Sequence, residues 1–378
     1  MPDLTVTING QEVVGKPGQT IMTLAHENGI HIPHLCGDRR LKPVGACRMC
    51  LVQVEGQKAP ITACTSEVMP GMVIQTETEE IRKIRKTILE LLFYEHRAVC
   101  TTCDAAGRCK LQRYGYDYQV DEEILTAIEK GEPNDNYTTG NKAIEYDPNK
   151  CIRCGRCVRI CDEVQGASAL TFKGRASNLE VSTAFDMELN SSTCELCGQC
   201  ISTCPTGALY ERDAKGKGQA ADIVRVRTTC PYCGVGCQME LNVNRRTNCI
   251  VRVTSRQGCL PNDGNLCVKG RFGFNYVHSD ERLKKPLIRK NGRLVEAEWD
   301  EAIALAGGRL REIRSQYGPD SIAFLSSCRC TNEENYLMQK IARTAGGTNN
   351  IDQCATTCHA PTVAGLASAF GSGAMTNS

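Results

Sequence analysis

The sequence contains few aromatic residues and no long hydrophobic run. Aromatic residues make up 5% of its 378 positions, and Trp299 is the single tryptophan. We therefore expect small apolar cores that bound metal helps to stabilise. Because no apolar stretch approaches the ~18–20 residues needed to cross a bilayer, we expect no membrane span. The N-terminal residues lack the basic and apolar regions of a secretion signal, which favours a cytoplasmic location.

Charge and glycine patterns argue against two further classes of protein. The net charge is only +2, with 45 Lys and Arg against 43 Asp and Glu, so a nucleic acid partner is not expected. No Gly-rich dinucleotide-binding fingerprint appears. If a nicotinamide cofactor takes part, we expect its site on another subunit.

Cysteine, in contrast, is abundant, with 25 residues. In a secreted protein this number would suggest a disulfide scaffold. Without a secretion signal, clustered cysteines are better interpreted as metal ligands. Nineteen of the cysteines, together with one histidine, fall into spacings that suit iron–sulfur clusters. The sequence therefore predicts an electron-transfer protein.

Two consecutive cysteine runs match the spacing of bacterial two-cluster ferredoxins. They are Cys151-x2-Cys154-x2-Cys157-x3-Cys161 and Cys194-x2-Cys197-x2-Cys200-x3-Cys204, the second followed by proline. In such proteins the fourth cysteine of each run binds the other cluster. We therefore expect one [4Fe–4S] cluster on Cys151, Cys154, Cys157 and Cys204, and another on Cys194, Cys197, Cys200 and Cys161. Zinc usually pairs two Cys-x2-Cys knuckles, so two tandem four-cysteine runs disfavour it.

Three further groups have less regular spacings. Cys36-x10-Cys47-x2-Cys50-x13-Cys64 lies in a β-rich region and suits a [2Fe–2S] cluster, with zinc as the alternative. His96-x3-Cys100-x2-Cys103-x5-Cys109 predicts a [4Fe–4S] cluster with one neutral ligand, unless His96 is a surface residue beside a three-cysteine site. Cys230-x2-Cys233-x3-Cys237-x29-Cys267 predicts one more [4Fe–4S] cluster. The expected cofactors are thus one [2Fe–2S] and four [4Fe–4S] clusters.

These three groups carry resemblances to known families. The Cys36 and His96 groups resemble modules of the large iron–sulfur subunit of respiratory complex I and of iron-only hydrogenases. The Cys230 group and the run Cys267-Val-Lys269-Gly270-Arg271 resemble the molybdopterin oxidoreductases, the dimethyl-sulfoxide-reductase superfamily. That resemblance implies that Lys269 lies between cluster and pterin and carries the electron path. Taken alone, Lys269 would be a surface lysine.

The segment that begins Cys354-x3-Cys358-His359-Ala-Pro-Thr is similar to the active-site segment of formate dehydrogenases. The resemblance implies that Cys358 binds molybdenum or tungsten of a bis-molybdopterin guanine dinucleotide cofactor, and that His359 helps to handle the proton. Without it, a buried cysteine near a helix start explains the pair about as well. The other cysteines are expected to be small buried hydrophobes: Cys249, Cys259, Cys328, Cys330 and Cys354.

The motifs divide the chain into the modules of an α+β protein. We expect a β-grasp [2Fe–2S] ferredoxin-like domain over residues 1–78, a helical His/Cys3 cluster module over 79–119 and a linker over 120–145. A two-cluster ferredoxin domain follows over 146–211, and a small [4Fe–4S] domain over 223–280. Residues 281–378 are expected to form the start of an α/β molybdopterin-binding domain, since about 98 residues are too few to enclose two pterins.

Local patterns predict several secondary-structure elements. A hairpin is expected over residues 4–14 with its turn at Asn9-Gly10, followed by a helix over 20–28. A helix over 79–96 has one apolar face, and its basic face is expected to be solvated. In the C-terminal part, helices over 298–317 and 335–345 flank a buried strand over 321–326. The basic face of the 79–96 helix carries Arg82, Lys83, Arg85 and Lys86.

Three functions are compatible with these patterns. The leading one is the catalytic subunit of a formate dehydrogenase, which interconverts formate and CO₂ and passes electrons to a flavin- and NAD(P)-binding iron–sulfur subunit or to ferredoxin. Electrons would run from Lys269 through the Cys230 cluster and the paired ferredoxin clusters to the His96 and Cys36 clusters. The second is a shortened relay subunit of an NAD(P) transhydrogenase or hydrogenase complex, without molybdenum chemistry. The third is an iron-only hydrogenase or a complex I subunit. The hydrogenase is disfavoured because no cysteine motif of the right form for its catalytic cluster follows residue 204. The complex I subunit is disfavoured by the paired ferredoxin runs and by Cys358-His359.

Overall fold

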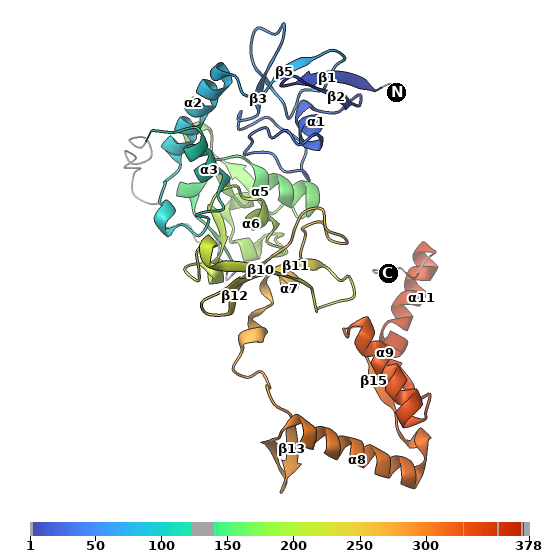
Figure 1. Ribbon diagram of the computed structural model, residues 1–378. Coiled ribbons are helices and arrows are strands. Elements are labelled where there is room, and N and C mark those ends of the chain that lie inside the picture. The colour runs from blue at the N-terminus through green and yellow to red at the C-terminus, as the bar shows by residue number, and fades with distance from the viewer. Residues whose placement is uncertain are drawn as a thin grey trace. The chain divides into compact units, whose positions relative to one another are not determined.

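The structure is a computed structural model that describes residues 3–121, 140–141, 143–327, 329–353, 355–371 and 373 (Figure 1). The chain divides into two compact units. The first contains Met1–Val226, Leu241–Thr254 and Asn265–Arg271, and the second contains Arg227–Glu240, Ser255–Gly264 and Phe272–Ser378. Both units contain helices and strands, arranged in successive modules along the chain, which confirms the expected α+β class.

A mixed five-stranded sheet opens the first unit, in the order β2-β1-β5-β3-β4. The expected hairpin is confirmed, since β1 and β2 are antiparallel with Ile8 opposite Gln11. Asn9 and Gly10 both have positive φ, 50° and 81°, as a tight two-residue hairpin turn requires. The strands are β1 (Leu4–Ile8), β2 (Gln11–Gly15), β3 (Leu51–Val54), β4 (Ile61–Thr62) and β5 (Val73–Gln75).

The helix α1 (Ile21–Glu27) packs against this sheet. Thr20 caps it by accepting a hydrogen bond from the Thr23 backbone N–H over 3.2 Å. Ile21 and Leu24 are fully buried in the same core as Val6 of β1. One helix on the face of a mixed sheet agrees with the β-grasp expectation.

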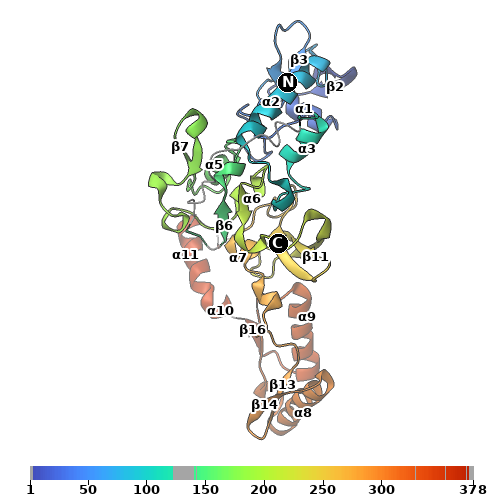
Figure 2. The ribbon, with the colours of Figure 1, turned by 90° about the vertical axis from the view of Figure 1, so that its left-hand side faces the viewer.

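Two further helices, α2 (Glu79–Glu95) and α3 (Lys110–Asp117), lie side by side in both views (Figures 1 and 2). Leu89 of α2 and Leu111 of α3 are fully buried in a second core. Cys36 and Cys47 belong to that same core. The helix pair therefore supports the loop that carries the first cysteines.

The basic face of α2 is not wholly solvated, contrary to the sequence-based expectation. Arg85 is fully buried. Its guanidinium donates to the Met49 and Leu51 carbonyl oxygens at 2.9 and 2.8 Å and also pairs with Glu77. Because these two carbonyls flank Cys50, Arg85 holds the cysteine loop rather than facing water.

Among its described residues, the middle of the first unit contains two short α-helices and two short antiparallel strand pairs. The helices α5 (Arg156–Arg159) and α6 (Gln199–Thr203) contact each other. Most of the expected linker over 120–145 lies outside the described residues, although β6 begins within it. The strand pairs are β6 (Ile144–Tyr146) with β9 (Leu209–Glu211), and β7 (Thr171–Lys173) with β8 (Glu180–Ser182).

A three-stranded sheet in the order β10-β11-β12 follows. Its strands are β10 (Ile223–Thr229), β11 (Gln238–Asn244) and β12 (Cys249–Thr254). The short helix α7 (Val268–Phe272) begins directly after Cys267. None of the helices in the described part of the chain has both the length and the apolar character that a membrane span needs.

The C-terminal residues confirm the expected helices but not a buried strand. The strand β15 spans only Phe324–Ser326, and Leu325 is 76% exposed because β16 is the one described strand that pairs with it. Thr331 and Glu334 form the predicted capping box. The elements are β13 (Leu287–Lys290), β14 (Arg293–Glu296), α8 (Trp299–Tyr317), β15, α9 (Asn332–Ile341), β16 (Ile351–Gln353), α10 (Ala355–Cys358) and α11 (Ala360–Phe370).

Candidate metal centres

The four N-terminal cysteines are buried and lie in two close pairs. The sulfurs of Cys50 and Cys64 are 3.3 Å apart. The Cys47 backbone N–H donates to the Cys36 sulfur over 3.4 Å. Two pairs of cysteines match the two irons of a [2Fe–2S] cluster with four cysteine ligands.

Charge limits how many of these four thiols can ionise without a cation. A hydrogen bond from the Cys47 thiol lowers the pKa of Cys36 to about 6. The same contact, together with burial, raises the pKa of Cys47 well above its usual range. One thiolate per pair is therefore accessible, and the second needs the positive charge that bound iron supplies.

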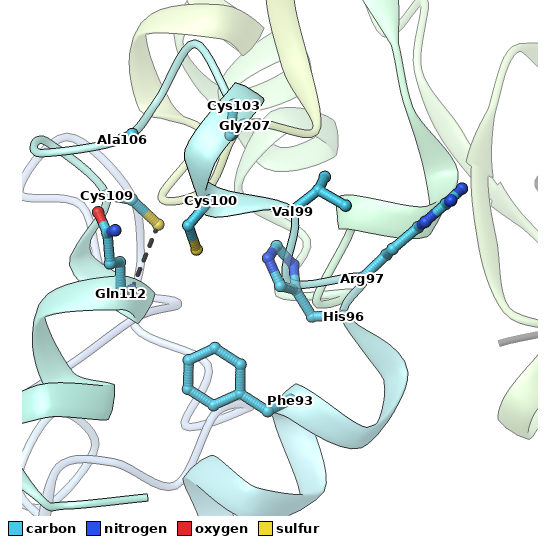
Figure 3. Close-up of a pocket in the computed structure, with 10 residues that line it drawn as sticks. All are labelled: Phe93, His96, Arg97, Val99, Cys100, Cys103, Ala106, Cys109, Gln112 and Gly207. Carbon is cyan, nitrogen blue, oxygen red and sulfur yellow. Dashed lines mark hydrogen bonds between the residues drawn. The ribbon is translucent and has the colours of Figure 1, made fainter. Parts of the chain in front are cut away.

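The second centre is a pocket around His96, Cys100, Cys103 and Cys109. Figure 3 shows the His96 ring and the Cys100 and Cys109 sulfurs turned toward one space, with Phe93 closing one side. His96 Nδ1 donates to the Lys150 carbonyl oxygen at 2.9 Å. That bond selects the tautomer in which Nε2 carries the lone pair, the form that a metal ligand needs.

Two backbone features shape this pocket. Cys109 is the N-cap of α3, and its sulfur accepts a hydrogen bond from the Gln112 backbone N–H over 3.5 Å. A thiolate at a helix N-terminus is stabilised by the helix dipole. Gly207 lies against Cys103, where a Cβ would come within 2.6 Å of the sulfur. The close approach leaves no room for a larger residue at position 207.

The two ferredoxin-like runs surround two separate pockets. Each pocket takes three cysteines from one run and the last cysteine from the other, as the sequence predicted. One pocket is lined by Cys151, Cys154, Cys157 and Cys204, and the other by Cys161, Cys194, Cys197 and Cys200.

The two runs also repeat each other in backbone conformation. Arg153 and Leu196 both have positive φ, 53° and 55°. Gly155 and Gly198 follow at 71° and 67°, and each begins a short helix, α5 or α6. The Arg153 and Leu196 backbone N–H groups each donate to the first cysteine sulfur of their run over 3.4 Å. The internal repeat is therefore one of geometry as well as of spacing.

The burial of these thiols fits metal binding. Burial raises the pKa of Cys154 to about 12 and that of Cys157 well above its usual value. Burial keeps these closely spaced thiols in the neutral form, whereas bound iron favours the thiolate form. Among the described residues, no three His, Cys, Asp or Glu side chains lie close enough to hold a single metal ion.

The centres of the first unit adjoin one another through buried polar contacts. Asp38, two residues after Cys36, accepts hydrogen bonds from Arg156 Nη2 at 3.0 Å and Thr203 Oγ1 at 2.8 Å. Arg156 and Thr203 are the neighbours of Cys157 and Cys204. Burial raises the pKa of Asp38, but its bonds with Arg40 and Thr203 outweigh burial and hold that pKa well below its usual range.

The His96 pocket meets the same ferredoxin-like centre from another side. Its histidine binds the carbonyl of Lys150, next to Cys151, and its Cys103 touches Gly207, three residues after Cys204. The pocket of Cys151 and Cys204 is thus adjacent to both the Cys36 and the His96 centres.

The cysteines of the remaining group, that of Cys230, are divided between the two units. Cys230 is buried, and its backbone N–H donates to the Cys237 carbonyl oxygen at 2.8 Å in the turn between β10 and β11. Cys233 in that turn is exposed. Cys267 and Lys269, which flank the start of α7, have exposed side chains in the first unit.

The residues expected at a molybdenum site lie at the surface of the described chain. Cys358 ends α10, His359 precedes α11, and both are exposed. The expectation of buried leftover cysteines is wrong for Cys249 and Cys330, which are exposed, and Cys259 is half-buried. Cys328 and Cys354 lie outside the described residues.

Spacing rules missed several residues that shape these centres. Asp38, Arg156, Gly207 and Arg271 do not belong to any metal-ligand pattern. Only their positions within four residues of a cysteine could have drawn attention to them. Their roles depend on contacts across the fold.

Family models match nearly all of the chain in five consecutive segments. Their descriptions are "2Fe-2S iron-sulfur cluster binding domain" (2–79), "NADH-ubiquinone oxidoreductase-G iron-sulfur binding region" (85–123), "NADH-quinone oxidoreductase subunit 3, ferredoxin-like domain" (141–210), "Molybdopterin oxidoreductase Fe4S4 domain" (223–279) and "Molybdopterin oxidoreductase" (282–378).

Curated relatives match over almost the whole chain. "Probable oxidoreductase YjgC" of Bacillus subtilis is 32% identical over 98% of this chain and 41% of the relative. "NADPH-Fe(3+) oxidoreductase subunit alpha" of Geobacter sulfurreducens is 36% identical over 92% of this chain and 40% of the relative. "Putative formate dehydrogenase SAB2186c" of Staphylococcus aureus is 31% identical over 98% of this chain and 41% of the relative. The chain spans about two fifths of the length of these relatives.

A solved structure shares the fold of part of the chain. It is described as the crystal structure of an NAD+-reducing [NiFe]-hydrogenase in the H2-reduced state. The match has a TM-score of 0.52 and 28% identity, and covers 57% of this chain and 90% of that one.

Proposed function

Because the chain belongs to the iron–sulfur molybdopterin oxidoreductases, we propose that it forms the electron-conducting part of a formate dehydrogenase catalytic subunit. Formate is oxidised to CO₂, or CO₂ is reduced, by the whole protein. The electrons pass to a flavin- and NAD(P)-binding iron–sulfur subunit or to ferredoxin. The proposed location is the cytoplasm.

The observation that carries this proposal is the adjacency of the cysteine centres in the first unit. The Cys36 loop binds α5 and α6 through Asp38, and the His96 pocket touches residues 150 and 207. Adjacent centres are what an electron path requires, because electron transfer fails over long gaps. The chain's own residues set each potential through ligand type, charge and burial.

Pockets support three of the ligand sets, and the cysteine spacings in the sequence suggest the other two. We assign the [2Fe–2S] cluster to the Cys36 group, and one [4Fe–4S] cluster each to the His96 group, the Cys230 group and the two ferredoxin pockets. The module boundaries are those expected from the sequence. Cys358 would bind molybdenum or tungsten, which supplies the site of formate oxidation when the cofactor is present. His359 would hold the proton, and Lys269 would lie on the electron path.

Metal analysis of the anaerobically purified native complex tests the proposal first. One [2Fe–2S] and four [4Fe–4S] clusters hold about 18 iron atoms per chain. Iron near that value together with about one molybdenum or tungsten supports the formate dehydrogenase assignment. Iron far below that value contradicts the cluster assignments.

Substitution of Cys358 tests the metal-binding role separately. We expect Cys358→Ala to abolish formate turnover while the iron content stays unchanged, because Cys358 lies outside the cluster pockets. The change is measured by formate-dependent reduction of an artificial acceptor. Unchanged turnover would exclude Cys358 as the metal ligand.

A second candidate function is electron relay alone. The chain would then be a relay in an NAD(P)-linked complex, without formate chemistry. The relative described as an NADPH-Fe(3+) oxidoreductase subunit supports this alternative. Full iron content without molybdenum or tungsten would establish the relay and reject the formate assignment.

A further inference from the structure

The short segment that carries Cys267 is bound to the second ferredoxin-like loop at both of its ends. Asn265 Oδ1 accepts hydrogen bonds from the Gln199 side chain and from Arg40 Nη1, the latter at 3.1 Å. Arg271 Nε donates to the Cys197 carbonyl oxygen at 2.7 Å. Cys267 therefore lies between two residues, Asn265 and Arg271, that form hydrogen bonds with residues 199 and 197.

Arg271 joins the two cysteines by a short path. Its backbone N–H donates to the Cys267 carbonyl oxygen at 3.0 Å, as the first turn of α7 requires. Its side chain then reaches the Cys197 carbonyl. Two hydrogen bonds and one side chain thus connect a ligand of the Cys230 group with a ligand of the Cys194 group.

Arg271 also brings a buried positive charge to the Cys194 group. Its side chain is 1% exposed, and its neighbours include Cys197, Cys200 and the buried carboxylate of Glu211. Nη2 is buried and has no hydrogen-bond acceptor among the described residues. A buried donor without a partner is costly, so an acceptor outside the protein atoms is expected there. Cluster sulfur is an acceptor of that kind.

We propose that Arg271 is the positioning residue for electron transfer between the cluster that includes Cys267 and the cluster of Cys161, Cys194, Cys197 and Cys200. Its charge raises the reduction potential of the latter cluster, and its Nε–H contact supplies the path. In each step one electron leaves the reduced Cys267 cluster and reduces the Cys194 cluster. No bond forms or breaks, and no proton is required. This inference rests on the proposed function, specifically on clusters at both positions.

Three variants of the full chain, prepared anaerobically with clusters in place, separate charge from contact. Arg271→Gln removes the charge, and Arg271→Lys keeps it but loses the Nε–H geometry. Arg252→Gln is the matched control, because Arg252 is also buried beside Glu211, but its ion pair is with Asp104 of the His96 centre, at 3.7 Å, and no described contact joins it to the Cys194 loop. The cluster's EPR signal is identified as the one that a Cys194→Ser variant lacks.

The first readout is the reduction potential from an EPR-monitored redox titration. For Arg271→Gln, we expect the ratio of reduced to oxidised Cys194 cluster at the wild-type midpoint to fall at least tenfold, about 59 mV for a one-electron centre. The potential in Arg271→Lys should stay close to the wild-type value, because this variant keeps the positive charge. Arg252→Gln should change the reduction potential of the Cys194 cluster much less than Arg271→Gln does. An unchanged potential in Arg271→Gln, or an equal shift in Arg252→Gln, overturns the electrostatic role.

The second readout is the rate of electron transfer between the two clusters after flash reduction. We expect at least a tenfold slower rate in both Arg271 variants and an unchanged rate in Arg252→Gln. If Arg271→Gln does not fold, Arg271→Lys still tests the proposal. A wild-type rate of electron transfer in that variant would show that the Nε–H contact is not the path. A chain that holds no iron at Cys194 refutes the proposed function instead. A chain with full iron and an insensitive potential and rate refutes only this inference.

Discussion

Gly207 lacks a side chain at a position where Cys103 leaves no space for one. A Cβ there would come within 2.6 Å of the cysteine sulfur and 3.2 Å of the Ala105 Cβ. We expect Gly207→Ala to displace Cys103 and to remove the His96 cluster, a loss of about four iron atoms per chain. Iron analysis and the EPR spectrum measure this loss.

Gly307→Ala provides the matched control for this substitution. Gly307 lies within α8, and a Cβ built there meets nothing within 4 Å. Alanine is favoured over glycine in a helix by about 1 kcal/mol. The control should therefore keep all of its iron, and full iron content in Gly207→Ala would show that position 207 tolerates a side chain.

Glu211 gives the protein a pH dependence near neutrality. Burial raises its pKa to about 7, although Arg252 and Arg271 oppose that rise. Since the folded pKa lies above the unfolded value of about 4.3, the stabilisation is complete below that value and is lost as the pH rises through 7. Glu211→Gln should flatten the decline in the urea midpoint between those pH values. An unaltered slope would show that Glu211 does not titrate there.

At the scale of elements, the loop after Cys36 is held on α5 and α6 by one carboxylate. The Asp38 side chain is 0% exposed and pairs with Arg40 at 3.1 Å and Arg156 at 3.0 Å. Asp38→Asn leaves two buried arginines without a counter-charge. Loss of one partner of a buried ion pair costs about 3–5 kcal/mol. We expect a destabilisation of that size in urea unfolding followed through the visible cluster absorbance.

An exposed ion pair on α2 supplies the comparison for Asp38. Glu79 and Lys83 pair at 2.9 Å with side chains that are 84% and 76% exposed. Water screens such exposed pairs, so Glu79→Gln should change the stability to unfolding little. Equal effects of the two substitutions would show that the buried network is not what holds the loop. Because the pKa of Asp38 is lowered, wild type should lose its advantage only as the pH falls below about 4.

At the scale of the whole molecule, cysteines of the N-terminal centre are built into the two apolar cores of the first unit. Cys36 and Cys47 are part of the core that joins α2 and α3. Iron removal by a chelator should therefore unfold this region, because thiols that lose their metal leave the core incompletely packed. Hydrogen exchange of residues 36–64 and 96–109 should rise strongly.

Trp299 serves as an internal control for iron removal. It is the single tryptophan, it begins α8, and it is 63% exposed in the second unit. Its fluorescence should stay unchanged while the exchange of the cysteine regions rises. A parallel change at Trp299 would mean that the clusters stabilise the C-terminal elements as well.

The sequence by itself determined the features that depend on neighbouring residues. The Asn9-Gly10 hairpin, the α8 helix and the capping box of α9 follow from local backbone preferences, and all three are confirmed. The cysteine spacings predicted the crossed ligand sets because a loop that wraps a cluster permits few separations. Those ligand roles stay predictions.

Only the tertiary structure decided which charged residues serve the centres. Arg85 was expected in water, yet it is buried against the carbonyls of Met49 and Leu51. Asp38 meets Arg156, and Arg271 meets Cys197, across 118 and 74 positions of the chain. No local pattern encodes such contacts, because each depends on loops that pack together only when the chain is folded. Burial then makes each charge strong enough to hold a loop or to shift the potential of a cluster.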